Sequence, residues 1–244
     1  TIDRSTIGNP VYTNNGFHQG AGKVICYDGY RTELVGNGVS NCDFEITSYG
    51  LSLKSGCALT INGNIQHASP GNNGMNGKSL IEAFTMGVSL TVNGNVIANE
   101  NYNVSITMVE SSSLSISGDL QLPGSIGNGS GSVIENHGSI LIGGQLKLGP
   151  YASYVDNFGT IEIGGTLIGD YDTYFIQESG AVAKFGGAVF PLDEGYLFAN
   201  DSPIYGSSHP NIIEFNGTAD QVVAFPADAA YSNLVINNNG AVAS

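Results

Sequence analysis

Carboxylate and tyrosine side chains gather in one segment of the chain, and their types are those of a sugar-processing or sugar-binding site. Asp170-Tyr171-Asp172 is the densest local cluster, and Asp156 and Glu178 are close to it in sequence. Two carboxyl groups about 5 to 10 Å apart can hydrolyse a glycosidic bond. Acidic residues at the corners of strands are usually solvated instead, so we predict that the chain is not an enzyme. A polysaccharide-degrading enzyme is the alternative.

The tyrosines of the same segment suggest a sugar-binding surface. A tyrosine ring has an apolar body that can stack on a pyranose face and a polar end that forms hydrogen bonds. The alternative is structural: Tyr154 and Phe175, 21 residues apart (175 − 154), stack in the core while Tyr151 and Tyr171 cap corners. We favour this structural role. The candidate ligand-binding residues are Tyr151, Asp170, Tyr171 and Asp172.

No cofactor or metal site is expected from the sequence. Carboxylates at Asp119, Asp170 or Asp172 could hold Ca²⁺, which prefers oxygen ligands. However, the nonapeptide repeat of glycine and aspartate found in calcium-loaded β-rolls is absent from the sequence. The sequence also lacks Cys-x-x-Cys, and its four His residues are scattered, which argues against a zinc site.

Three cysteines, Cys26, Cys42 and Cys57, lie in the first quarter of the chain. An odd number allows at most one disulfide within the chain and leaves one thiol over. Cys26 and Cys42 are the candidate pair. The alternative is that all three are small buried apolar side chains, as free cysteines often are.

The composition excludes several classes of protein. Of the 244 residues only 11% are charged, against an ordinary share of about 25%. The formal charge of −14 is incompatible with binding nucleic acid through its phosphates. No apolar run approaches the length of about 18 residues needed to span a membrane. A hydrophobic share of 41% also excludes a disordered polar tract. The 35 glycines indicate a protein of short strands and turns.

An internal repeat accounts for this composition. Residues 135–146 align with residues 156–167 without a gap, at an offset of 21 (161 − 140). The shared unit is apolar-x-apolar-x-Gly-x-apolar, which indicates a strand, a glycine corner and a second strand. Looser copies occupy residues 59–65, 90–96, 114–120, 213–217 and 234–238.

The repeat length predicts the fold. About 21 residues at ~3.3 Å each give a path of about 70 Å, which is one coil of three short strands. We therefore predict an all-β chain that forms a single right-handed parallel β-helix, a solenoid of about 21 residues per coil. An antiparallel β-sandwich is the alternative, because periodicity does not distinguish parallel from antiparallel pairing.

Equivalent residues of successive coils are expected to stack on one another. Stacked Asn side chains can form a ladder of hydrogen bonds along the axis. Glu135 is expected on Asp156, with Gln177 near Asp156, and a buried like-charge stack would raise one of the two pKa values. The predicted structural ladder consists of Asn136 on Asn157 and Gly144 on Gly165.

Two segments near the end of the chain carry a resemblance. Residues 212–223 contain Phe-Asn-Gly-Thr-x-x-Gln, and residues 231–238 read Tyr-x-Asn-Leu-x-Ile-Asn-Asn. Together they resemble units of bacterial cell-surface and adhesin-like β-solenoid proteins. The units at 136–144 and 157–165 are similar to that group and to the N-terminal β-helix domains of yeast cell-wall adhesins. The resemblance covers about residues 50–240. It implies a secreted, surface-displayed β-helix, and it specifies no ligand.

These observations define the expected organisation and function. Residues 1–50 are expected to form an N-terminal cap or the first coils, and residues 51–244 the β-helix repeats, in one structural domain that belongs to a longer protein. We expect an extracellular, adhesin-like module that presents a rigid face to a host or cell-surface glycan or protein. A self-assembling filament or matrix subunit, whose partners are like subunits, is a further alternative. Nucleic-acid binding and membrane insertion are not expected.

Overall fold

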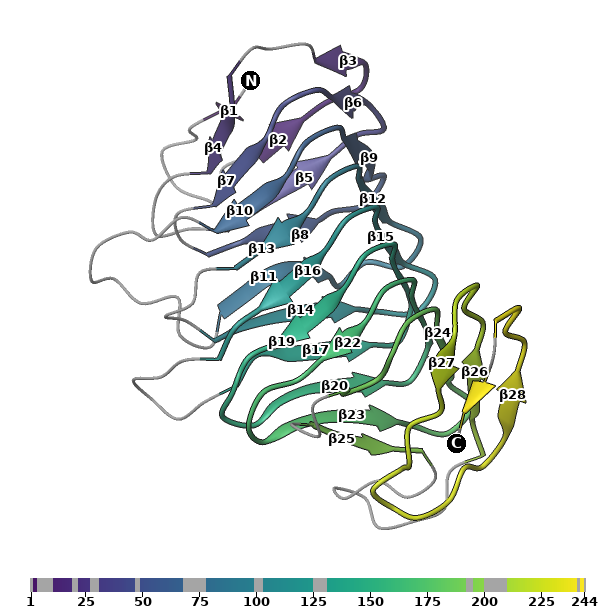
Figure 1. Ribbon diagram of the computed structural model, residues 1–244. Coiled ribbons are helices and arrows are strands. Elements are labelled where there is room, and N and C mark those ends of the chain that lie inside the picture. Colours follow the sequence, from purple (N-terminus) through teal and green to yellow (C-terminus); the bar gives the residue numbers. More distant parts are fainter. Residues whose placement is uncertain are drawn as a thin grey trace.

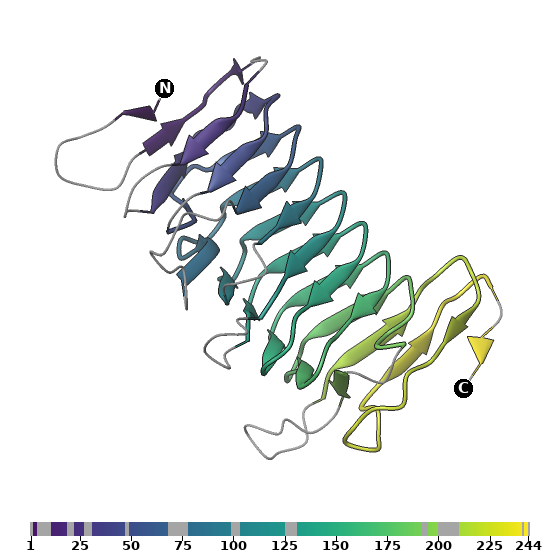
Figure 2. The same ribbon diagram turned by 60° about the vertical axis from the view of Figure 1, so that its left-hand side comes forward.

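The computed structural model is a β-solenoid in which parallel strands stack in about eight turns of roughly 22 residues. Figures 1 and 2 show the coils following one another from the N-terminal to the C-terminal end. The described part of the chain contains no helix. The structure describes residues 2–3, 11–18, 22–26, 31–46, 49–67, 78–98, 103–124, 131–191, 195–199, 210–240 and 242–243.

Most coils contribute one strand to each of three sheets, which we name A, B and C. Sheet A consists of β1 (Ile2–Asp3), β2 (Val11–Thr13), β5 (Thr32–Val35), β8 (Leu51–Leu53), β11 (Lys78–Ala83), β14 (Val104–Met108), β17 (Val133–Asn136), β20 (Ser153–Asn157), β23 (Thr173–Gln177) and β25 (Gly195–Phe198). Sheet B consists of β3 (Phe17–His18), β6 (Val39–Ser40), β9 (Ala58–Ile61), β12 (Ser89–Val92), β15 (Ser113–Ile116), β18 (Ser139–Ile142), β21 (Thr160–Ile163), β24 (Val182–Phe185), β26 (Ile212–Phe215) and β28 (Leu234–Ile236). Sheet C consists of β4 (Val24–Cys26), β7 (Phe44–Ile46), β10 (Ile65–His67), β13 (Val96–Ile97), β16 (Leu120–Leu122), β19 (Leu146–Leu148) and β22 (Leu167–Ile168). A fourth pair joins β27 (Gln221–Val222) to β29 (Val242–Ala243).

The parallel pairing confirms the predicted solenoid and rules out the antiparallel sandwich. Leu114 pairs with Ile140, and Ile140 pairs with Ile161, so inward side chains form continuous apolar rows. These rows are buried and make up the core. Among the described strands, only β1 and β2 pair antiparallel, at the N-terminal edge of sheet A. Within residues 1–50, β2 to β7 already belong to the three sheets and form the first coils.

Glycine stacking at the corner between sheets B and C is confirmed. A Cβ on Gly165 would lie 2.6 Å from the carbonyl oxygen of Gly144. A Cβ on Gly144 would lie 2.2 Å from Oδ1 of Asp119 and 2.8 Å from the carbonyl oxygen of Gly118. Successive coils approach too closely here for any side chain, so the repeat requires glycine at this position.

The predicted asparagine ladder is also confirmed, and it lies inside the solenoid. Asn136 Nδ2 donates to Asn157 Oδ1 at 2.8 Å, and Asn157 Nδ2 donates to Gln177 Oε1 at 2.9 Å. The same two amide nitrogens donate to the carbonyl oxygens of Thr160 and Val182 in sheet B. The ladder therefore ties each coil to the next and also ties sheet A to sheet B.

A second ladder, which the sequence analysis did not identify, runs along the outside of the corner between sheets B and C. The backbone N–H of Asn95 donates to Asn64 Oδ1, and that of Asp119 donates to Asn95 Oδ1, both at 2.8 Å. The N–H of Gln145 continues the series by donating to Asp119 Oδ1 at 2.8 Å. Asp119, one of the residues considered for calcium, thus holds the next coil in place.

The observed strand register corrects the expected stacking of Tyr154 on Phe175. Asn136 pairs with Asn157 after 21 residues, but Asn157 pairs with Gln177 after only 20 (177 − 157). Tyr154 therefore pairs with Tyr174 on the outer face, and not with Phe175 in the core. For the same reason Asp156 pairs with Ile176 and not with Gln177.

The expected disulfide between Cys26 and Cys42 is not formed, and all three cysteines are buried thiols. Phe44 pairs with Val24, so Cys42 lies opposite residue 22, four positions before Cys26. Four residues of near-extended chain span roughly 13 Å. That distance is well beyond the Cα separation of about 7 Å that a disulfide tolerates.

The internal ladder leads to a stability prediction. Asn157→Ala removes three hydrogen bonds, two of them fully buried, and leaves their partners unsatisfied. We therefore expect a loss of about 2 kcal/mol or more in the free energy of unfolding, measured with urea. Asn93→Ala is the matched control, because Asn93 donates to Asn62 at 2.7 Å in an exposed ladder. The control is expected to lose less than about 1 kcal/mol. Equal losses for the two variants would contradict a structural role for the buried ladder.

Candidate ligand-binding site

All four candidate ligand-binding residues lie at one corner, where sheet C turns into sheet A. The backbone N–H of Tyr151 donates to the carbonyl oxygen of Tyr171 at 3.1 Å, so the two tyrosines occupy adjacent coils. Tyr171 is 73% exposed, and Asp170 beside it is also exposed. Tyr151 and Asp172 have positive φ angles of 69° and 61°, which non-glycine residues rarely adopt. The corner is therefore tight, and it directs these side chains outward.

A row of tyrosines on the outer face of sheet A continues this corner. Tyr154, Tyr174 and Tyr196 are neighbours on β20, β23 and β25. The rings of Tyr174 and Tyr196 stack with centroids 5.6 Å apart, and Tyr196 is 50% exposed. We name the set of Tyr151, Tyr154, Tyr171, Tyr174 and Tyr196 the tyrosine corner.

Asp172 fixes one ring of the tyrosine corner. The Tyr174 hydroxyl donates a hydrogen bond to Asp172 Oδ1. This bond, together with partial burial and the charge of Asp172, raises the pKa of Tyr174 to about 12. Tyr174 therefore stays neutral at physiological pH, and its ring is held against Tyr196 as a rigid surface.

A pair of buried carboxyl groups lies beside the tyrosine row. Asp156 pairs with Glu135 as expected, and it is only 7% exposed although it is on the outer face. Burial raises the pKa of Asp156 to about 7, with further contributions from the charges of Glu178 and Glu135 and from a hydrogen bond with Glu178. Glu178 is 2% exposed. Glu135 is half exposed and contributes less than burial and Glu178, so the raised pKa of Asp156 does not arise mainly from the expected stack with Glu135.

This pair does not have the spacing used in glycoside hydrolysis. Hydrolases hold their two carboxyl groups roughly 5 to 9.5 Å apart, so that the sugar and, in some enzymes, a water fit between them. Asp156 and Glu178 share a direct hydrogen bond, which brings them closer than that range. The arrangement instead suits a buried pair that retains a proton.

A groove runs along the outer face of sheet C and reaches the tyrosine corner. It has two parts, of about 500 Å³ and 270 Å³, and Ile97 lines both. Asp170 lines the second part, together with Pro123 and Pro150. The floor is one row of in-register outward residues, namely Glu45, Gln66, Ile97, Gln121 and Lys147.

The coils that contribute to this floor differ in length, so a fixed 21-residue offset does not bring its residues into line in the sequence. A usable signal was nevertheless present, since Gln66, Gln121 and Lys147 each stand three residues after a corner glycine. The corner from sheet B to sheet C has a constant length, as in the coil where β9 ends at Ile61 and β10 begins at Ile65. Counting from the glycines would therefore have identified the row.

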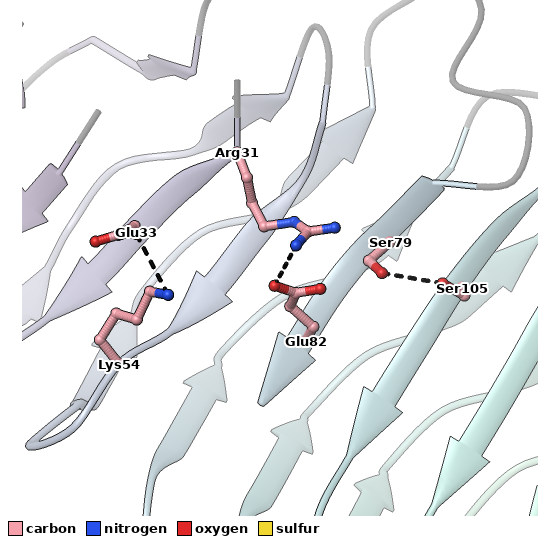
Figure 3. Close-up of polar contacts among 6 residues, drawn as sticks. All are labelled: Arg31, Glu33, Lys54, Ser79, Glu82 and Ser105. Atoms are coloured by element: carbon pink, nitrogen blue, oxygen red, sulfur yellow. Dashed lines mark hydrogen bonds and ion pairs between the residues drawn. The ribbon is translucent and has the colours of Figure 1, made fainter. Parts of the chain in front are cut away.

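The N-terminal half of sheet A is occupied by structural polar contacts (Figure 3). Arg31 forms an ion pair with Glu82 at 2.6 Å, and Lys54 pairs with Glu33 at 3.3 Å. The Glu82 side chain is 2% exposed. This part of the sheet therefore resembles a structural surface more than a binding face.

Metal ligands do not converge in the described part of the chain, where no three His, Cys, Asp or Glu side chains meet in a suitable group. No helix among these residues has the length and apolar character to cross a membrane.

Comparison with known proteins gives no assignment. The chain matches no family model, no curated protein and no solved structure. The function must therefore be inferred from the chemistry of the site.

The carboxyl pair leads to a prediction on pH dependence. The pKa of Asp156 is about 7 in the folded protein, against an ordinary value of 3.8. Between these values the unfolded chain loses the proton and the folded chain keeps it, so stability falls as the pH rises from about 4 to about 7. We expect Asp156→Asn, which remains uncharged, to gain stability over the natural protein at pH 8 and much less at pH 4 in urea unfolding.

The matched control for this prediction is Glu110→Gln, which neutralises an exposed carboxylate. It is expected to change stability little at either pH. A gain for Asp156→Asn that is equal at both pH values would show that the carboxyl pair does not titrate as described.

Proposed function

We propose that this protein is a secreted, surface-displayed, adhesin-like module that binds glycans and does not cleave them. The observation that carries the proposal is the tyrosine corner. Tyr151 and Tyr171 lie at the corner that carries Asp170 and Asp172, and Tyr154, Tyr174 and Tyr196 form a row on the adjoining face of sheet A. Tyr171 and Tyr196 are at least half exposed. Ring faces and carboxylates in fixed positions are a suitable surface for sugar rings and their hydroxyl groups.

Rigidity supports the same proposal. Tyr154 and Tyr174 lie on strands that are paired on both sides along the axis, and Tyr196 lies on the edge strand β25, which pairs with β23. Little side-chain and backbone entropy is therefore lost on binding. The repeat style of residues 136–165 and 212–238, which is similar to that of cell-surface solenoids, supports display outside the cell. The low share of charged residues also suits a face that recognises neutral hydroxyl groups.

A glycan array with the purified chain, followed by calorimetry on the strongest ligand, tests the proposal. Tyr171→Ala and Tyr196→Ala are each expected to weaken binding about tenfold, which corresponds to ~1.4 kcal/mol. The control is Phe84→Ala, because Phe84 is an aromatic side chain 63% exposed at the end of β11. Absence of binding to any glycan, or equal effects in all three variants, would overturn the proposal. Release of shorter products from a bound glycan would overturn its non-enzymatic part.

A further inference from the structure

We infer that the groove on sheet C binds a single uncharged polysaccharide chain lying along the solenoid axis. This inference rests on the proposed glycan-binding function and extends it from the tyrosine corner to a second, longer surface. Three features carry it: the course of the groove, the amide groups that line it and its charge.

The two parts of the groove adjoin at Ile97 and follow the axis. Its floor takes one residue from each of five successive coils, from Glu45 on β7 to Lys147 on β19. At a strand spacing of about 4.8 Å, five positions extend over about 19 Å. Because Ile97 lines both parts and Asp170 closes the second, an extended chain in the groove would reach Tyr171 at the tyrosine corner.

Amide groups provide most of the hydrogen-bonding capacity of the groove. In the described part of the chain, the side chains of Gln66 and Gln121 make no hydrogen bonds, so both amides are available to a ligand. The side-chain oxygens of Asn64 and Asn95 accept backbone N–H groups of the next coil. The Asn64 NH₂ group also donates to Asp43 Oδ1 at 3.3 Å, whereas the Asn95 NH₂ group is left to donate to a ligand. An amide both donates and accepts, as a sugar hydroxyl does. Each coil thus offers a partner for a hydroxyl group.

The charges of the groove favour an uncharged ligand. Lys23 is already paired with Glu45. The remaining charged residues that line the groove are Asp43, Asp170 and Lys147, which together leave it slightly negative. In a protein with a net charge of −14, a polyanion such as a uronic-acid chain is repelled. A polycation would be attracted, but the amides would then have no specific role.

Apolar surface in the groove matches the faces of sugar rings. Ile97 lies in the middle of the floor, and Pro123 and Pro150 line the end nearest the tyrosine corner. Small-ligand sites typically combine apolar surface with a few polar groups that fix the orientation of the ligand. The amides and small apolar surfaces of the groove form such a combination.

Calorimetry with neutral oligosaccharides of increasing length tests the inference. The probes are gluco-, manno- and galacto-oligosaccharides of two or more units, with galacturonate and glucosamine oligomers of equal length. We expect affinity to rise with length until the chain spans the groove. Gln66→Ala and Gln121→Ala should each weaken binding of the longest neutral probe about fivefold and leave disaccharide binding unchanged. Tyr171→Ala should weaken both.

The matched control is Ser115→Ala, on the same coil as Gln121 but on the outer face of sheet B, and it should have no effect. Affinity that is independent of length, with binding at the tyrosine corner retained, would overturn the groove inference and leave the proposed function standing. Equal or tighter binding of the galacturonate or glucosamine oligomers would overturn the uncharged class. Failure of every probe to bind would overturn both proposals.

Discussion

In-register stacking is the constraint on which the rest of the structure depends. Each residue lies on its counterpart one coil away, about 4.8 Å along the axis. A side chain in this position must therefore tolerate a near-copy of itself as a neighbour. Amides do so by pairing, as Asn136, Asn157 and Gln177 show. Apolar residues pack, and glycines allow the close approach of coils at the corner between sheets B and C.

Like charges that stack on adjacent coils repel each other, and this repulsion explains the low share of charged residues. Asp156 stacks on Glu135, and its pKa rises to about 7, mainly because it is buried and also because of the charges of Glu178 and Glu135. Where opposite charges stack, they form ion pairs, as Lys184 and Glu214 do at 3.3 Å. The acidic balance therefore reflects surface positions outside these rows, and the rows themselves remain mostly neutral.

Much of the fold could be predicted from the sequence because the 21-residue offset recurs without gaps where coils carry no insertions. The stacks of Asn136 on Asn157 and Gly144 on Gly165 follow directly from that offset. The pairing of Tyr154 could not be predicted in this way, because the next coil is one residue shorter and one residue reverses the face of a strand. The prediction of a Cys26–Cys42 disulfide was wrong for a related reason, because residues that are close in sequence need not lie close together on adjacent coils.

The site could be predicted only in part. Tyr151, Asp170, Tyr171 and Asp172 were correctly placed near one another because they lie on adjacent corners. Tyr196 and the groove floor were missed, because they come from coils of unequal length that a fixed 21-residue offset does not align. Stacking nevertheless brings these residues together. Each coil contributes one side chain, and the side chains of successive coils form one surface.

The register that forms the tyrosine corner is therefore the central claim, and disulfide trapping measures it most directly. In a background with the three native cysteines replaced by alanine, Tyr154→Cys combined with Tyr174→Cys should form a disulfide on mild oxidation. Paired Cα atoms of adjacent strands lie about 4.8 Å apart, within the range of about 4.4 to 6.8 Å that a disulfide needs. Tyr154→Cys combined with Phe175→Cys should remain reduced, because those side chains point to opposite faces. Trapping of the 154–175 pair in preference to the 154–174 pair would contradict the account.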